Sequence, residues 1–138
     1  MDFEKHMINS LSALLKKNEC LQLAFYGTLH TGSLIKPHEY YCFFGLAGND
    51  LLVVCYSPLF HKNRFAVRVP LQVNQVKIKK SSLGGKYQLS FRLNNTAWSP
   101  FEKFKIKVKS EHPKLKSQKE SVAAFLSYID NSFLERRQ

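Results

Sequence analysis

The chain has 138 residues, the length of one domain, and at this size folding buries roughly two-thirds of the surface that the unfolded chain exposes. Hydrophobic residues make up 44% of the sequence and charged residues 22%, which excludes a disordered or low-complexity protein. Lysines and arginines number 21 against 10 acidic residues, so the formal net charge is +11 and an anionic partner is one candidate.

The cysteines and the hydropathy pattern indicate the cellular compartment of the protein. Cys20, Cys42 and Cys55 are too few and too widely spaced for a disulfide framework or a CxxC metal site. Residues 1–17 contain charges and no continuous apolar run, and no segment approaches the roughly 18 apolar residues of a membrane span. The sequence therefore predicts no signal peptide and no transmembrane segment, and we expect a reduced, cytoplasmic protein.

The N-terminal segment has the pattern of an amphipathic helix. Apolar residues recur at three- and four-residue spacing, and Asp2 is a suitable N-cap, which predicts a helix over Phe3–Lys17 that ends near Asn18. Its apolar stripe must pack against another apolar surface. That surface is either the apolar strands of its own domain or another subunit. We divide the chain into this helix, residues 1–19, and one domain, residues 20–138.

Seven β-strands are predicted after this helix. Residues 40–47 and 51–57 are apolar at nearly every position, so we expect both faces of these strands to be covered. In the fifth strand the apolar residues change from one face of the strand to the other, which predicts a one-residue bulge near Asn74 or Gln75. Gly84 and Gly85 supply the next turn. The predicted strands span residues 21–30, 40–47, 51–57, 65–69, 71–80, 86–93 and 103–109.

The last segment is predicted to be helical. Ser117 and Glu120 have the spacing of an S-x-x-E capping box, and apolar residues that include Phe125 follow at helical spacing. The pattern predicts a helix over residues 117–136. The whole chain is therefore expected to be mainly β, with about seven antiparallel strands, a closing helix and an extra N-terminal helix.

Two stretches resemble bacterial members of the pleckstrin-homology (PH) superfold. Residues 45–54, GLAGNDLLVV, resemble their second hairpin, and residues 69–86, VPLQVNQVKIKKSSLGGK, resemble their fifth strand, the following turn and the start of the sixth strand. The resemblance covers roughly residues 20–133. It implies a PH-like seven-stranded, two-sheet barrel closed at one end by the C-terminal helix. The loops after strands one, three and six would surround the other, open end. It also implies a binding or assembly module, without naming a partner.

Strand parity places eight basic side chains on the outer face of the second sheet, with no acidic residue among them. Neighbouring like charges on a sheet repel, so such a face is most stable against counterions, phosphates or acidic side chains. The alternative is a solvated face or a lysine-guarded edge that opposes aggregation. The candidate anion-binding residues are Lys77, Lys79, Lys86, Arg92, Lys103, Lys105, Lys107 and Lys109.

A second candidate set lies in the loops that would surround the open end of the barrel. Cations beside exposed aromatic rings suit a phospholipid surface, because phosphates pair with cations while rings enter the interfacial layer. The first loop lacks the clustered lysines and arginines of phosphoinositide-binding PH domains, which argues against specific headgroup recognition. The open-end candidates are Lys36, His38, His61, Lys62, Arg64 and Trp98.

No motif for catalysis or metal binding stands out. The five histidines show no HExxH spacing, and no G-x-S-x-G stretch is present. The sequence predicts no enzyme, no metal and no cofactor. Lysine dominates over arginine, and the aromatic residues of the last two strands face inward, which argues against nucleic acid as a partner.

We therefore predict a non-catalytic binding or assembly module that acts through protein interaction or self-association. The alternative is weak electrostatic binding to an anionic membrane surface through the basic second half of the chain, where residues 61–138 contain 17 basic and five acidic side chains.

Overall fold

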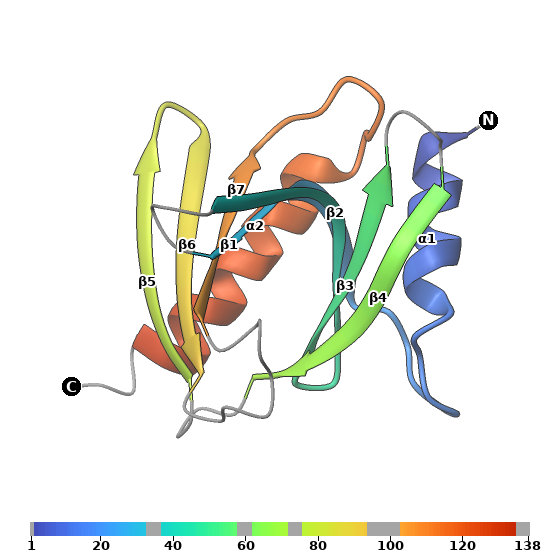
Figure 1. Cartoon of the computed structure of the whole chain (residues 1–138), viewed down its shortest axis with the longest axis horizontal. Coiled ribbons are helices and arrows are strands. Elements are labelled where there is room, and N and C mark those ends of the chain that lie inside the picture. The colour runs from blue at the N-terminus through green and yellow to red at the C-terminus, as the bar shows by residue number, and fades with distance from the viewer. Residues whose placement is uncertain (1, 33–36, 58–61, 72–75, 94–102, 135–138) are drawn as a thin grey trace.

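The computed structural model describes residues 2–32, 37–57, 62–71, 76–93 and 103–134. An N-terminal helix, α1 (Phe3–Ser12), precedes seven strands, and a second helix, α2 (Gln118–Ile129), continues into a π-helical turn, η2 (Asp130–Leu134) (Figure 1). The strands are β1 (Leu23–Gly32), β2 (Pro37–Ala47), β3 (Asp50–Ser57), β4 (Lys62–Pro70), β5 (Val76–Leu83), β6 (Lys86–Leu93) and β7 (Lys103–Lys109).

The strands form an antiparallel sheet in the order β4-β3-β2-β1-β7-β6-β5, so the first and last strands of the chain are neighbours. This pairing is short, because only Thr28–His30 of β1 lie opposite Lys105–Lys107 of β7. The observed architecture confirms the predicted class, mainly β with a helix at each end of the chain. It is also consistent with a PH-like barrel.

Strand ends differ from the predictions where pairing extends into polar or glycine-rich sequence. β6 and β7 have the predicted bounds, whereas β1 and β2 remain paired as far as Gly32 and Pro37, within the predicted loop of residues 31–39. Main-chain pairing continues there regardless of side-chain polarity, and proline is tolerated at the first residue of a strand. β4 begins at Lys62 because polar residues are compatible with the strand at the end of the sheet order.

The fifth strand is displaced toward the following turn. It begins at Val76 and runs to Leu83, because its last residues pair with β6 across Gly84 and Gly85, which both have positive φ. The bulge predicted near Asn74 or Gln75 lies outside the described residues. The register shift that the structure shows lies between β3 and β4, at Cys55 and Tyr56.

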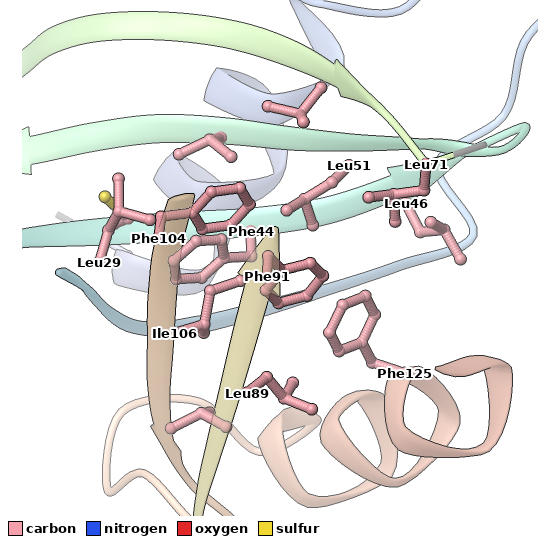
Figure 2. Close-up of a cluster of buried hydrophobic side chains, with 14 of the residues drawn as sticks. Leu29, Phe44, Leu46, Leu51, Leu71, Leu89, Phe91, Phe104, Ile106 and Phe125 are labelled. Atoms are coloured by element: carbon pink, nitrogen blue, oxygen red, sulfur yellow. The ribbon is translucent and has the colours of Figure 1, made fainter. Parts of the chain in front are cut away.

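The main core lies between the sheet and α2. Figure 2 shows Phe125 projecting from α2 toward the sheet, and its ring centroid lies 5.0 Å from that of Phe25 on β1. Phe91 and Phe104, on β6 and β7, stack with their centroids 4.7 Å apart. The final helix therefore contributes to the same core as strands from both halves of the sheet.

A second core explains the apolar character of β2 and β3 on both faces. The helix α1 lies on the side of β3 and β4 away from α2 (Figure 1). Its Met7 and Leu11 are fully buried in a cluster that includes Phe43, Leu52 and Val54. The N-terminal helix therefore packs on its own domain, which is the first of the two surfaces considered above.

The helix α1 begins as predicted but ends five residues earlier. The Asp2 carboxylate accepts a hydrogen bond from the Lys5 amide at 3.1 Å, as expected for an N-cap. The helix stops at Ser12, and Asn18 has a φ of 69°, so the chain has turned before residue 19. A tertiary contact accounts for the early end of the helix, because Glu19 is bound to Arg68 on β4.

Arg68 connects three segments through a half-buried ion cluster. Its guanidinium donates to the carboxylates of Glu19 and Asp50 and to the carbonyl oxygen of Leu14. Hydrogen bonds from Arg68 and from the Lys16 amide lower the pKa of Glu19 from 4.5 to about 2, against an opposing effect of desolvation. The cluster thus joins the end of α1 to the β2–β3 hairpin and to β4.

The predicted capping box at residue 117 is wrong. The Ser117 hydroxyl makes no hydrogen bond to the amides of α2 and donates instead to the carboxylate of Glu4 on α1. The α-helix spans residues 118–129 and then widens into η2, while residues 135 and 136 lie outside the described part. A contact between the two ends of the chain therefore replaces the local cap.

Candidate anion-binding site

The structure brings the eight candidate cations to one exposed face of β5, β6 and β7. In the strand register, Lys77 lies opposite Arg92, and Arg92 lies opposite Lys103, so three cations form a row across the three strands. Lys86 lies opposite Lys109 in a second direct pair. We call this surface the basic face. It consists of Lys77, Lys79, Lys86, Arg92, Lys103, Lys105, Lys107 and Lys109.

The basic face has no acidic counterpart within its own strands. β5, β6 and β7 contain no aspartate or glutamate, and among the described residues no ion pair links these eight side chains to an acid. Lys80, which has the opposite parity on β5, pairs with Asp130 at 2.7 Å. Directly opposed like charges disfavour each other by up to about 1 kcal/mol per pair, so the face favours contact with negative charge.

A groove with a volume of about 930 Å³ lies at the end of the basic face nearest the β5–β6 turn. One wall carries Tyr26 and Tyr41, whose rings stack with centroids 6.3 Å apart, and His112, whose ring lies 5.3 Å from that of Tyr26. The other wall is the β5–β6 hairpin, with Leu83 and Lys86. The groove is therefore bounded by aromatic rings on one side and by an apolar and a basic side chain on the other.

The floor of the groove is the place where β1 and β7 separate. Gln118 reaches from α2 into this gap and is only 1% exposed. Its amide nitrogen donates to the carbonyl oxygens of Tyr26 at 2.9 Å and Lys109 at 3.0 Å, and its amide oxygen accepts from the Tyr26 amide at 2.9 Å. Gln118 thus supplies the hydrogen bonds that the strands would otherwise make with each other.

Gly27 allows β1 and β7 to approach each other closely beside this gap. A Cβ atom at this position would lie 2.8 Å from the carbonyl oxygen of Lys107 on β7. Any larger side chain would push β1 away from β7, so glycine fixes the width of the groove floor.

Two titratable groups of the groove, Tyr26 and His112, favour their neutral forms. Burial, with smaller effects of Tyr41, Cys42 and Tyr56, raises the pKa of Tyr26 to about 12. Burial and nearby lysines lower the pKa of His112, and burial and Lys107 lower that of His30, which is hydrogen-bonded to the lining residue Thr28. Positive charge at the groove therefore comes from its lysines, and Tyr26 carries no negative charge at neutral pH.

The open-end candidates do not form an equivalent site among the described residues. His38 lies on β2, and Lys62 and Arg64 lie on β4, so the prediction that these three are loop residues is wrong. The strand β3 separates the two strands that carry them. The other three open-end candidates are Lys36, His61 and Trp98, which lie outside the described residues.

The aromatic residues of the groove were missed by the sequence analysis, whereas its lysines, Lys86, Lys107 and Lys109, were among the predicted candidates. Tyr26, Tyr41 and His112 stand on three different segments, and nothing local indicates that their rings come together. The available signal was weak: Tyr26 and Thr28 share the parity that faces away from Phe25, which lies in the core. Using that signal requires knowledge that β1 pairs with β7.

Three other features of the described residues bear on function. They contain no group of three or more histidine, cysteine, aspartate or glutamate side chains placed to hold a metal ion. Cys42 and Cys55 are buried and lie opposite each other on β2 and β3. Within the same part of the chain, every helix is too short or too polar to cross a membrane.

Comparison with known proteins gives a likeness at the level of the fold. No family model matches the sequence, and no curated protein matches it. Among solved structures, the chain is similar to the hSac2 domain from human phosphoinositide phosphatase Sac2, with a TM-score of 0.51. The two share 10% sequence identity over 94% of this chain and 79% of that one. At this identity the likeness concerns the fold alone.

Proposed function

We propose that the protein is a non-catalytic, PH-like binding module that holds an acidic partner protein on its basic face. The observation that carries this proposal is the placement of eight exposed cations on three adjacent strands that contain no acid. A partner with acidic side chains would relieve the repulsion between them. The sequence motifs and the strand order support the PH-like assignment, and a fold by itself does not indicate a ligand.

The groove favours a protein partner over a membrane. A lipid bilayer contacts the protruding parts of a protein, whereas here part of the basic surface is recessed between the tyrosine wall and the β5–β6 hairpin. A polypeptide can enter such a recess. A membrane partner remains the alternative because Leu83, at the hairpin tip, is exposed beside cations.

A binding assay with matched charge variants tests the proposal. The probes are a fluorescein-labelled polyglutamate peptide and vesicles of phosphatidylcholine with or without phosphatidylserine, each at low and physiological salt. We expect the peptide to bind, with affinity falling as salt rises. The test variant replaces all four lysines of β7 by glutamine and should weaken peptide binding about tenfold, because each exposed charge pair contributes up to about 1 kcal/mol. The substituted residues are Lys103, Lys105, Lys107 and Lys109.

The control variant removes the same net charge from exposed positions outside the basic face. It replaces Lys5, Lys17, Lys116 and Lys119 by glutamine and should keep nearly the wild-type affinity. Equal losses in both variants would mean that only net charge matters and would contradict a defined site. Binding to phosphatidylserine vesicles without binding to the peptide would favour the membrane alternative. No binding to either probe at low salt would identify the lysines as a solubility device.

The proposed absence of catalysis has a separate test. Among the described groove residues, the Thr28 hydroxyl is hydrogen-bonded to the His30 ring at 2.9 Å, whereas the Tyr26 hydroxyl stays protonated at neutral pH, so Thr28 is the first position to test. We expect no hydrolase or transferase turnover with added divalent metals. Robust turnover abolished by one groove substitution would overturn this part of the proposal.

A further inference from the structure

The exposed apolar side chains of the described residues are concentrated at the groove. Only three large hydrophobic residues in the described part are exposed: Ile8 at 38%, Tyr41 at 45% and Leu83 at 85%. Tyr41 and Leu83 both line the groove, on opposite walls, whereas Ile8 lies on α1. Exposed apolar side chains that line one groove and are surrounded by polar residues are typical of a binding site.

The charge of the groove is complementary to an acidic chain. Lys86, Lys107 and Lys109 line it, and Glu111 is the one acidic residue among the described lining residues. Lys79 and Lys105 lie in the neighbouring row of the basic face. Carboxylates of a segment lying in the groove would therefore meet lysines of β6 and β7.

The dimensions suit a short extended segment. The lining residues come from five neighbouring strands, β2, β1, β7, β6 and β5. At about 4.8 Å per strand this is a span of about 19 Å, which corresponds to about six residues of extended chain at 3.3 Å each. The floor is already hydrogen-bonded through Gln118, so the occupant need not pair with the main chain of β1 or β7.

We propose that the groove binds an extended acidic segment of the partner protein that carries two large apolar side chains, one against Tyr41 on the first wall and one against Leu83 on the second. Carboxylates between these two side chains lie against the lysines of β6 and β7. The proposal rests on the proposed function, because the basic face supplies the long-range attraction. It adds a requirement for apolar groups at two positions, which gives the site a preference that charge alone would not give.

Two labelled eight-residue peptides test this requirement. The first has two phenylalanines six positions apart with glutamates at the other positions, and the second has alanine in place of both phenylalanines. Fluorescence anisotropy at low salt should show the phenylalanine peptide binding about tenfold more tightly to the wild-type chain, as expected for partial burial of two aromatic side chains. The same measurement is made on Leu83→Ser and Tyr41→Thr, and each should reduce this preference to about threefold, the share of one remaining contact, while keeping the affinity for the alanine peptide.

The chain offers a matched control in Ile8→Ser, which removes the third exposed apolar side chain, one that does not line the groove. This variant should keep the tenfold preference. Leu83 is 85% exposed, so its substitution leaves the fold unchanged, and circular dichroism and thermal melting verify this.

The outcomes separate the two proposals. Equal binding of both peptides, with weaker binding by the β7 lysine variant, would refute the groove proposal and leave the basic face as the site. Loss of the preference in Ile8→Ser as well would also refute it. Absence of binding by both peptides at low salt would refute the proposed function together with the groove. Vesicle binding that depends on Leu83, without peptide preference, would assign the hairpin tip to a membrane instead.

Discussion

Replacing Gln118 by leucine should strongly destabilise the fold. Leucine has a similar size but makes none of the three hydrogen bonds to the main chain of Tyr26 and Lys109. One amide and two carbonyl groups lose their partner, and each such loss costs about 1–3 kcal/mol when the group is buried. At the low end of this range, the three groups together give an expected loss of about 3 kcal/mol.

Urea denaturation at 25 °C measures this loss as a change in the free energy of unfolding. Hydrogen exchange adds a local readout, because the Tyr26 amide should lose protection when Gln118 is replaced. The control is Gln88→Leu, on the outer face of β6, which should change stability by no more than about 0.5 kcal/mol. A loss below about 1 kcal/mol in Gln118→Leu, with the Tyr26 amide still protected, would refute the idea that Gln118 holds β1 and β7 together.

Three further substitutions test the packing and the ion cluster. Phe125→Ala should cost roughly 3–5 kcal/mol, because the ring is buried against Phe25, and an unchanged thermal midpoint would exclude a core role for α2. Gly27→Ala should cost about 1–3 kcal/mol by forcing β1 from β7, and wild-type urea stability would contradict this. Because its pKa is about 2 when folded and 4.5 ordinarily, Glu19 stabilises the fold above about pH 4.5, and this contribution disappears as the pH falls toward 2. Melting curves of Glu19→Gln should show a weaker pH dependence in that window, and a dependence equal to that of the wild type would contradict the role of the ion cluster.

The sequence by itself was enough to predict those strands and helices in which polar and apolar residues alternate with the period of the element. β6 and β7 have the predicted bounds, since each side chain's polarity matches the face on which it lies. The same parity placed the lysines of β7 together without any structural information. The N-cap at Asp2 was also predictable, because it depends on contacts within three residues.

The tertiary structure alone decided the contacts between distant segments. Ser117 has the local sequence of a cap, yet it bonds to Glu4, and α1 ends early where Glu19 meets Arg68. The groove depends on the pairing of β1 with β7 and on the gap that Gln118 fills. Apart from the bond from Gln118 to Lys109, nine positions away, these contacts join residues between 49 and 113 positions apart. Their energy depends on which strands become neighbours, which local alternation does not encode.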